Sequence, residues 1–179
     1  MKQWHVFGLA LSCFVLGGIA QATFAQNKKP VFNASIYQGQ DKKTAATTLL
    51  DGALYFAGNG SWERIAVGRA WYLGGDKERG QQIFDGVTNS RGVEASDWFR
   101  VARVYVEAGE WVKAQQAFDS GLAKDTGNDS GMIEYGALAN VNGDRTRAEE
   151  LFGKAFAKND DEFWHWVGAG ASYLGVKPQ

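Results

Sequence analysis

The chain has 179 residues, of which 45% are hydrophobic and 22% are charged, and its formal net charge is −1. This composition excludes a collagen-like or wholly disordered chain and is typical of one or two globular domains. The near balance of 19 basic and 20 acidic residues argues against a nucleic-acid partner, because phosphate binding requires a surplus of lysine and arginine. The 23 glycines and 2 prolines favour helices joined by glycine turns.

Residues 1–25 have the features of a secretory signal peptide. Lys2 supplies the positive charge, an apolar run covers residues 6–16, and residues 20–22 (Ala-Gln-Ala) match a cleavage site, with a second possible site at Ala25. The run is too short to cross a bilayer comfortably, and no later run approaches that length. We expect cleavage, and a periplasmic or secreted protein without a membrane span; a retained membrane anchor is the alternative.

Cleavage would limit the chemistry of the remaining chain, residues 26–179. Cys13 is the only cysteine, and His165 would be the only histidine left after His5 is removed. Disulfides, thiolate catalysis, cysteine-ligated zinc and multi-histidine metal sites would then be impossible. No pair of side chains stands out as catalytic, so we expect no cofactor, no metal and no enzymatic activity.

Residues of similar size recur every 34 positions after the signal segment. One column contains small residues in the order Gly68, Ala102, Gly136 and Gly170. Four more columns keep the same spacing without a gap: Trp71, Tyr105, Ala139 and Tyr173; Gly75, Gly109 and Gly143; Gly80, Ala114 and Ala148; and Phe84, Phe118 and Phe152. A weaker copy precedes them, with Ala34, Tyr37, Ala46, Leu50 and Ala53. Such periodicity is typical of a repeat protein.

Each copy is predicted to form two helices. In residues 98–105 apolar side chains fall at helical spacing, residues 108–110 interrupt the pattern, and residues 111–123 resume it. The predicted repeats cover about residues 30–60, 61–94, 95–128 and 129–162, followed by a cap helix over 163–176. We expect N-caps at Ser61, at Ser96 or Asp97, and at Ser130. Small residues should let paired helices approach closely, and the three phenylalanines should fill the space between repeats.

The pattern resembles that of the tetratricopeptide repeat family, because the 34-residue length and the order of aromatic, small, Tyr, Ala and Phe positions match it. The third copy matches best, with Trp98, Val101, Ala102, Tyr105, Ala114 and Phe118. The late proline of the family is absent from every copy. The resemblance implies an all-α fold: a right-handed α-α superhelix of about four helix-turn-helix repeats plus a C-terminal capping helix.

The resemblance also implies a function, since the family binds proteins or peptides along the inner face formed mainly by the first helix of each repeat. We therefore expect a non-enzymatic scaffold or adaptor of the bacterial cell envelope. Arg69 and Arg103 share one column, and we expect them to hold a carboxylate or acidic peptide beside aromatic rings. The alternative is that both arginines are solvated and pair with Glu63 or Glu107. The predicted partner-binding residues are Trp62, Arg69, Tyr72, Phe99, Arg103 and Asn140. Further inner positions are Ile65, Ser96, Val106, Ser130, Ile133, Ala137, Trp164, Val167 and Ala171.

Two further functions stay open. Trp62, Trp111 and Trp164 have no assigned packing role and could stack on sugars, which would make the chain a carbohydrate- or peptidoglycan-binding module. The last helix has a broad apolar stripe, which could pair two chains as a homodimer. That stripe contains Trp164, Trp166, Val167, Tyr173 and Leu174.

Overall fold

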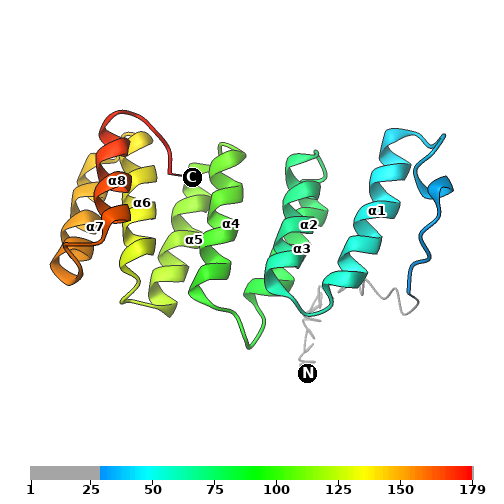
Figure 1. The fold of residues 1–179 in the computed structure, drawn as a ribbon, viewed down its shortest axis with the longest axis horizontal. Coiled ribbons are helices and arrows are strands. Elements are labelled where there is room, and N and C mark those ends of the chain that lie inside the picture. The colour runs from blue at the N-terminus through cyan, green and yellow to red at the C-terminus, as the bar shows by residue number, and fades with distance from the viewer. Residues whose placement is uncertain (1–28, 179) are drawn as a thin grey trace, which may run out of the picture.

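The computed structural model describes residues 29–178, and these form an all-helical array without a strand (Figure 1). The all-α prediction is therefore confirmed. A short 3-10 helix, η1 (Ala34–Ile36), precedes the α-helices. These are α1 (Lys42–Ala57), α2 (Ser61–Leu73), α3 (Lys77–Thr88), α4 (Ala95–Glu107), α5 (Trp111–Lys124), α6 (Asp129–Val141), α7 (Arg145–Lys158) and α8 (Phe163–Tyr173).

Three helix hairpins, α2/α3, α4/α5 and α6/α7, stand side by side in an elongated row. Helix α1 packs on α2 at one end of the row, and α8 packs on α6 at the other (Figure 1). The first helices of the hairpins are thus α2, α4 and α6, and the second helices are α3, α5 and α7. No helix within residues 29–178 is both long enough and apolar enough to cross a membrane.

The turns inside the hairpins follow one design. Gly75, Gly109 and Gly143 have φ angles of 102°, 74° and 91°, a region that glycine enters without a steric penalty. The residue after each glycine donates its backbone N–H to the carbonyl five positions earlier, as Glu110 does to Tyr105 at 2.8 Å. The predicted glycine breaks are therefore confirmed.

Small residues and phenylalanine rings set the distance between paired helices. A Cβ atom on Gly68 would lie 2.6 Å from the Phe84 ring, and one on Gly136 would lie 2.7 Å from the Phe152 ring. Ala102, in the same column, has no exposed surface. Phenylalanine also fills the space between hairpins, because Phe118 stacks on Tyr135 with centroids 4.8 Å apart. Close approach at the small residues is thus confirmed.

Two sequence expectations require correction. Residues 30–60 do not form a complete helix pair, because only η1 precedes α1 where a full first helix was expected. The predicted N-caps are also wrong, since Gly60, Glu94 and Asn128 occupy those positions and the serines lie inside the helices. Glu94 forms a capping box with Asp97, so a glutamate occupies the N-cap position where a serine was expected.

Candidate functional site

Two of the six predicted partner-binding residues are buried. Tyr72 is 1% exposed and Phe99 is 5% exposed, so neither side chain can contact a partner on the surface of this fold. The Phe99 ring lies between two glycines, because a Cβ atom on Gly121 would lie 2.4 Å from it and one on Gly131 would lie 2.6 Å from it. These two positions are corrected: Phe99 joins the second hairpin to the third, and Tyr72 belongs to the core.

Both predicted arginines pair with glutamates on the next first helix. Arg69 on α2 donates its Nε–H to Glu107 on α4 at 2.8 Å, and Arg103 on α4 donates from Nη2 to Glu134 on α6 at 2.6 Å. A second hydrogen bond completes each pair, so both are bidentate. The hydrogen bonds to Glu134 raise the pKa of Arg103. The Glu107 alternative therefore holds for Arg69, whereas Arg103 has a partner that the sequence did not indicate.

Trp62 and Asn140 lie apart from the arginine pairs. Trp62 is exposed, and the Arg100 guanidinium lies 3.3 Å from its ring centroid in a cation–π contact between α2 and α4. Asn140 is half-buried and donates to the Ser172 hydroxyl on α8 at 2.9 Å. The six predicted residues thus do not form one site.

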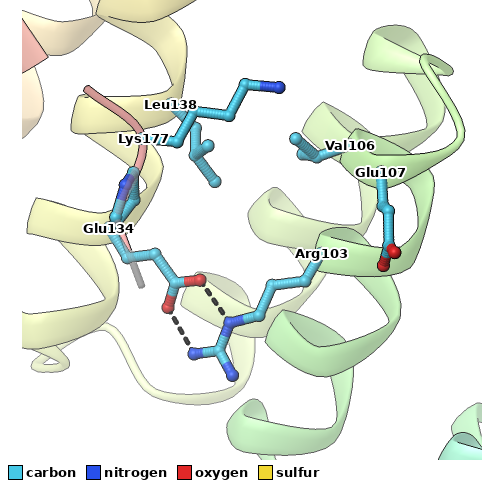
Figure 2. A pocket seen from close by; sticks show the side chains of 7 residues that line it. Arg103, Val106, Glu107, Glu134, Leu138 and Lys177 are labelled. Carbon is cyan, nitrogen blue, oxygen red and sulfur yellow. Dashed lines mark hydrogen bonds and ion pairs between the residues drawn. The ribbon is translucent and has the colours of Figure 1, made fainter. Parts of the chain in front are cut away.

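A small cavity of about 220 Å³ lies between α4 and α6. Figure 2 shows the Arg103–Glu134 pair spanning its lower part, with the Lys177 side chain extending across its upper part toward Val106. Glu107, Leu138 and Pro178 complete the lining. Lys177 forms no ion pair with any of residues 29–178.

A larger cavity of about 550 Å³ lies between α6 and α8 and shares Glu134, Lys177 and Pro178 with the small one. Its lining is mainly apolar, and Trp164, at 69% exposure, is its largest side chain. The other lining residues are Ser130, Ile133, His165, Val167, Gly168, Ala171 and Val176. We call the two adjoining cavities together the first-helix groove, because α4, α6 and α8 supply their helical walls.

The C-terminal segment forms part of this groove. Gly175 has a φ angle of 75°, and the Val176 backbone N–H bonds to the Ala171 carbonyl at 3.0 Å. This glycine cap ends α8 and turns the chain back, so that residues 176–178 line the cavity beside α6. Figure 1 shows the segment curving from α8 toward α4 and α5.

Sequence reasoning located part of the groove. Arg103 and six further inner positions line the two cavities: Val106, Ser130, Ile133, Trp164, Val167 and Ala171. It missed Glu134, because the 34-residue column of this residue has no shared character: its other members are Ala66, Arg100 and Gly168. It also missed Val176, Lys177 and Pro178, because no repeat column extends to a segment that follows the last helix.

A third cavity of about 530 Å³ lies away from the groove, between α3 and α5. Trp98 and Tyr105 of α4 line it together with polar side chains of the two flanking helices, Gln81, Lys113, Gln116 and Ser120. Tyr105 donates its hydroxyl to Gln81 at 2.8 Å.

The described helices thus offer three cavities lined by apolar and polar side chains. Among residues 29–178, no cluster of three histidine, cysteine, aspartate or glutamate side chains could hold a metal ion. His165 is buried and its ring contacts Ser130 and the Asn159 carbonyl. In comparisons with known proteins, no family model and no curated protein matches this chain.

Proposed function

We propose that this chain is a non-enzymatic, tetratricopeptide-like adaptor that binds an extended segment of a partner protein in the first-helix groove. The observation that carries the proposal is the apolar cavity between α6 and α8, in which the exposed Trp164 and Val167 side chains face open space. Exposed apolar side chains around a cavity of this size are typical of sites that receive a side chain of a ligand. A right-handed superhelical course of the hairpins belongs to the same proposal.

The lining suggests which sequence would bind. An aliphatic or aromatic side chain would fill the space between Trp164 and Ile133. Because Arg69 and Arg103 already pair with glutamates, an acidic group of the ligand would instead contact Lys177 at the junction of the two cavities. The expected ligand is therefore an apolar residue close to an aspartate, a glutamate or a C-terminal carboxylate.

Selection from a random-peptide phage library tests this proposal. We expect enriched peptides to share an apolar residue next to an acidic one. Trp164→Ala should weaken the binding of such a peptide about 10- to 30-fold, since truncation of an aromatic side chain that becomes buried on binding costs about 2 kcal/mol. Lys177→Glu should weaken it by a similar factor. Fluorescence polarisation with a labelled synthetic peptide measures both effects.

Trp62→Ala is the matched control, because Trp62 is similarly exposed but lies outside both cavities. It should leave peptide affinity unchanged. Enrichment of peptides whose affinity falls with Trp62→Ala and not with Trp164→Ala would mean that the groove is assigned to the wrong surface.

A second candidate, carbohydrate binding, is supported by the cavity between α3 and α5. Its lining combines the half-buried Trp98 ring with the amides of Gln81 and Gln116, and sugar rings are bound by such a combination of stacking and hydrogen bonding. Pelleting with purified cell-wall sacculi, together with the absence of any enriched peptide, would favour this function over the first.

We place the adaptor outside the cytoplasm, in the periplasm or the medium. The support is the signal-like pattern of residues 1–25, which lies outside the described residues. Sequencing the N-terminus of the protein recovered from the native envelope tests this localisation. An intact Met1 on cytoplasmic protein would contradict it.

A further inference from the structure

The two ends of the row have the character of half repeats. Helix α1 aligns by 34 residues with the second helices, since Ala46 corresponds to Gly80, Ala114 and Ala148. Helix α8 aligns with the first helices, since Gly170 corresponds to Gly68, Ala102 and Gly136. Within residues 29–178, α1 therefore has no first helix paired with it, and α8 has no second helix.

The face of α8 that a second helix would cover is open. Gly68 and Gly136 each lie against a phenylalanine ring, whereas a Cβ atom on Gly170 would meet nothing within 4 Å. Large apolar side chains flank Gly170 on this face, because Trp166 is 62% exposed and Tyr173 is 50% exposed. The counterparts of Tyr173 in the other repeats are buried, namely Trp71, Tyr105 and Ala139.

The face of α1 that a first helix would cover is open as well. Ala46 is exposed, whereas its counterparts Ala114 and Ala148 have no exposed surface. Leu49 is 43% exposed, whereas its counterparts Ile83 and Leu151 are each 1% exposed. Among the described residues that precede α1, Pro30 lies beside Gly52, whose counterpart Gly86 is exposed in α3, and Ala46 stays exposed.

We propose that copies of this chain associate head to tail, with the open face of α8 in one copy packing on the open face of α1 in the next. The two open faces have the same 34-residue spacing as the three intramolecular hairpins. In both, small residues allow the partner helix to approach and apolar residues fill the contact. A second copy is the occupant that carries both complementary faces. In this contact Leu50 would lie on Gly170, as Phe84 lies on Gly68 within the first hairpin.

This interface is heterologous, so the association leaves one free face at each end and can grow. One helix pair buries less area than a standard protein interface of about 1,600 Å², so we expect association at micromolar or higher concentration. The inference concerns the ends of the row and does not depend on the first-helix groove.

Sedimentation equilibrium of the purified full chain tests the proposal over about 1 µM to about 1 mM, a range that covers weak association. The average mass of the unmodified protein should rise with concentration. Gly170→Trp and Ala46→Trp should each weaken self-association about 100-fold, because each ring would occupy the space of the partner helix. Both sites are exposed in the single copy, so both variants should fold.

A mixture of the two variants is decisive. The Gly170→Trp copy keeps an intact α1 face and the Ala46→Trp copy keeps an intact α8 face, so together they should form a one-to-one dimer that does not grow. Gly86→Trp is the matched control, since Gly86 lies at an exposed helical position in α3, which belongs to neither end helix of the row. It should assemble normally. A mass that stays monomeric at the highest concentration overturns the proposal, and so does assembly that survives Ala46→Trp, because it would show that α8 pairs with something other than α1.

Discussion

Glu110 is the centre of a charge cluster that joins two neighbouring hairpins. It accepts the Tyr72 hydroxyl at 2.6 Å and forms ion pairs with Lys77 and Lys113, while Lys113 also donates to the Tyr72 hydroxyl at 2.9 Å. These bonds lower the pKa of Glu110 to about 2, with the largest contribution from Lys113. The cluster joins α3 of one hairpin to the start of α5 in the next, so a single carboxylate links two repeats.

The contribution of Glu110 to stability should depend on pH in a defined direction, and replacing this residue should remove that dependence. Because the pKa of Glu110 is about 2 in the folded chain and 4.5 ordinarily, its stabilisation is present above pH 4.5 and is lost as the pH falls toward 2. Glu110→Gln should therefore lower the free energy of unfolding by about 1 kcal/mol at pH 7, a value reduced by solvent screening, and by much less near pH 2. Urea denaturation at both pH values measures the difference.

Glu63→Gln serves as the control for this experiment, because Glu63 is exposed at the start of α2 and lies outside the cluster. An equal effect of Glu110→Gln at pH 7 and near pH 2 would show that the charge of Glu110 contributes nothing to the fold.

The burial of Phe99, which was predicted to contact a partner, shows why the sequence located only part of the candidate site. Helix α4 has apolar side chains over more than half of its circumference, including Trp98, Phe99 and Val101. An apolar stripe of this width does not indicate which of its residues point toward the groove and which point toward the next hairpin. Neighbouring residues along the helix can lie on either of these two faces. The informative residues are far from Phe99 in the sequence. Gly121 and Gly131 lie within helices, where glycine lowers helix stability unless a neighbouring side chain such as the Phe99 ring occupies the space of the missing Cβ.

At the scale of the element, the column of small residues explains the hairpins. The glycine turns and the 34-residue spacing predicted which segments pair, since both properties depend on local backbone conformation and on contacts repeated in each copy. The helix starts were less predictable, because Gly60, Glu94 and Asn128 occupy the N-cap positions one or two residues before the expected serines. No local signal indicated either that residues 29–41 would form only the short helix η1.

Adding a side chain at a position of the small-residue column should destabilise a hairpin only where a phenylalanine ring already fills the adjacent space. Gly136→Leu would place its Cβ 2.7 Å from the Phe152 ring and 3.2 Å from the Ala148 carbonyl oxygen. Because Phe152 is buried and cannot move away, we expect a loss of about 2 kcal/mol in the free energy of unfolding. Chemical denaturation with circular dichroism measures it.

Gly170→Leu is a matched control, since Gly170 occupies the same column in open space. At concentrations below self-association it should change stability by about 0.5 kcal/mol or less. Comparable losses in the two variants would mean that the helical backbone at this position, rather than the phenylalanine ring, disfavours the leucine.

At the scale of the whole molecule, stability depends on the contacts between neighbouring hairpins, because an open array has no single central core. The junction between α4/α5 and α6/α7 relies on a few named contacts. The Phe99 ring lies between Gly121 and Gly131, Phe118 stacks on Tyr135, and the Arg103–Glu134 pair lies in the exposed groove. An exposed ion pair contributes about 1 kcal/mol or less, so the aromatic contacts dominate the coupling.

Phe99→Ala should therefore divide the cooperative unfolding of the array. The truncation removes a ring that two helices of different hairpins enclose, at a cost of about 3 to 5 kcal/mol. We expect the single urea transition to become two. Amides in α2 and α3 should then lose their protection from hydrogen exchange at a different urea concentration from amides in α6 and α8. Phe152→Ala deletes the same ring inside one hairpin, and should lower the midpoint while α4 and α6 still exchange together. Coincident exchange of both halves in Phe99→Ala would contradict the argument, since it would mean that the remaining contacts across this junction are enough to make the array a single folding unit.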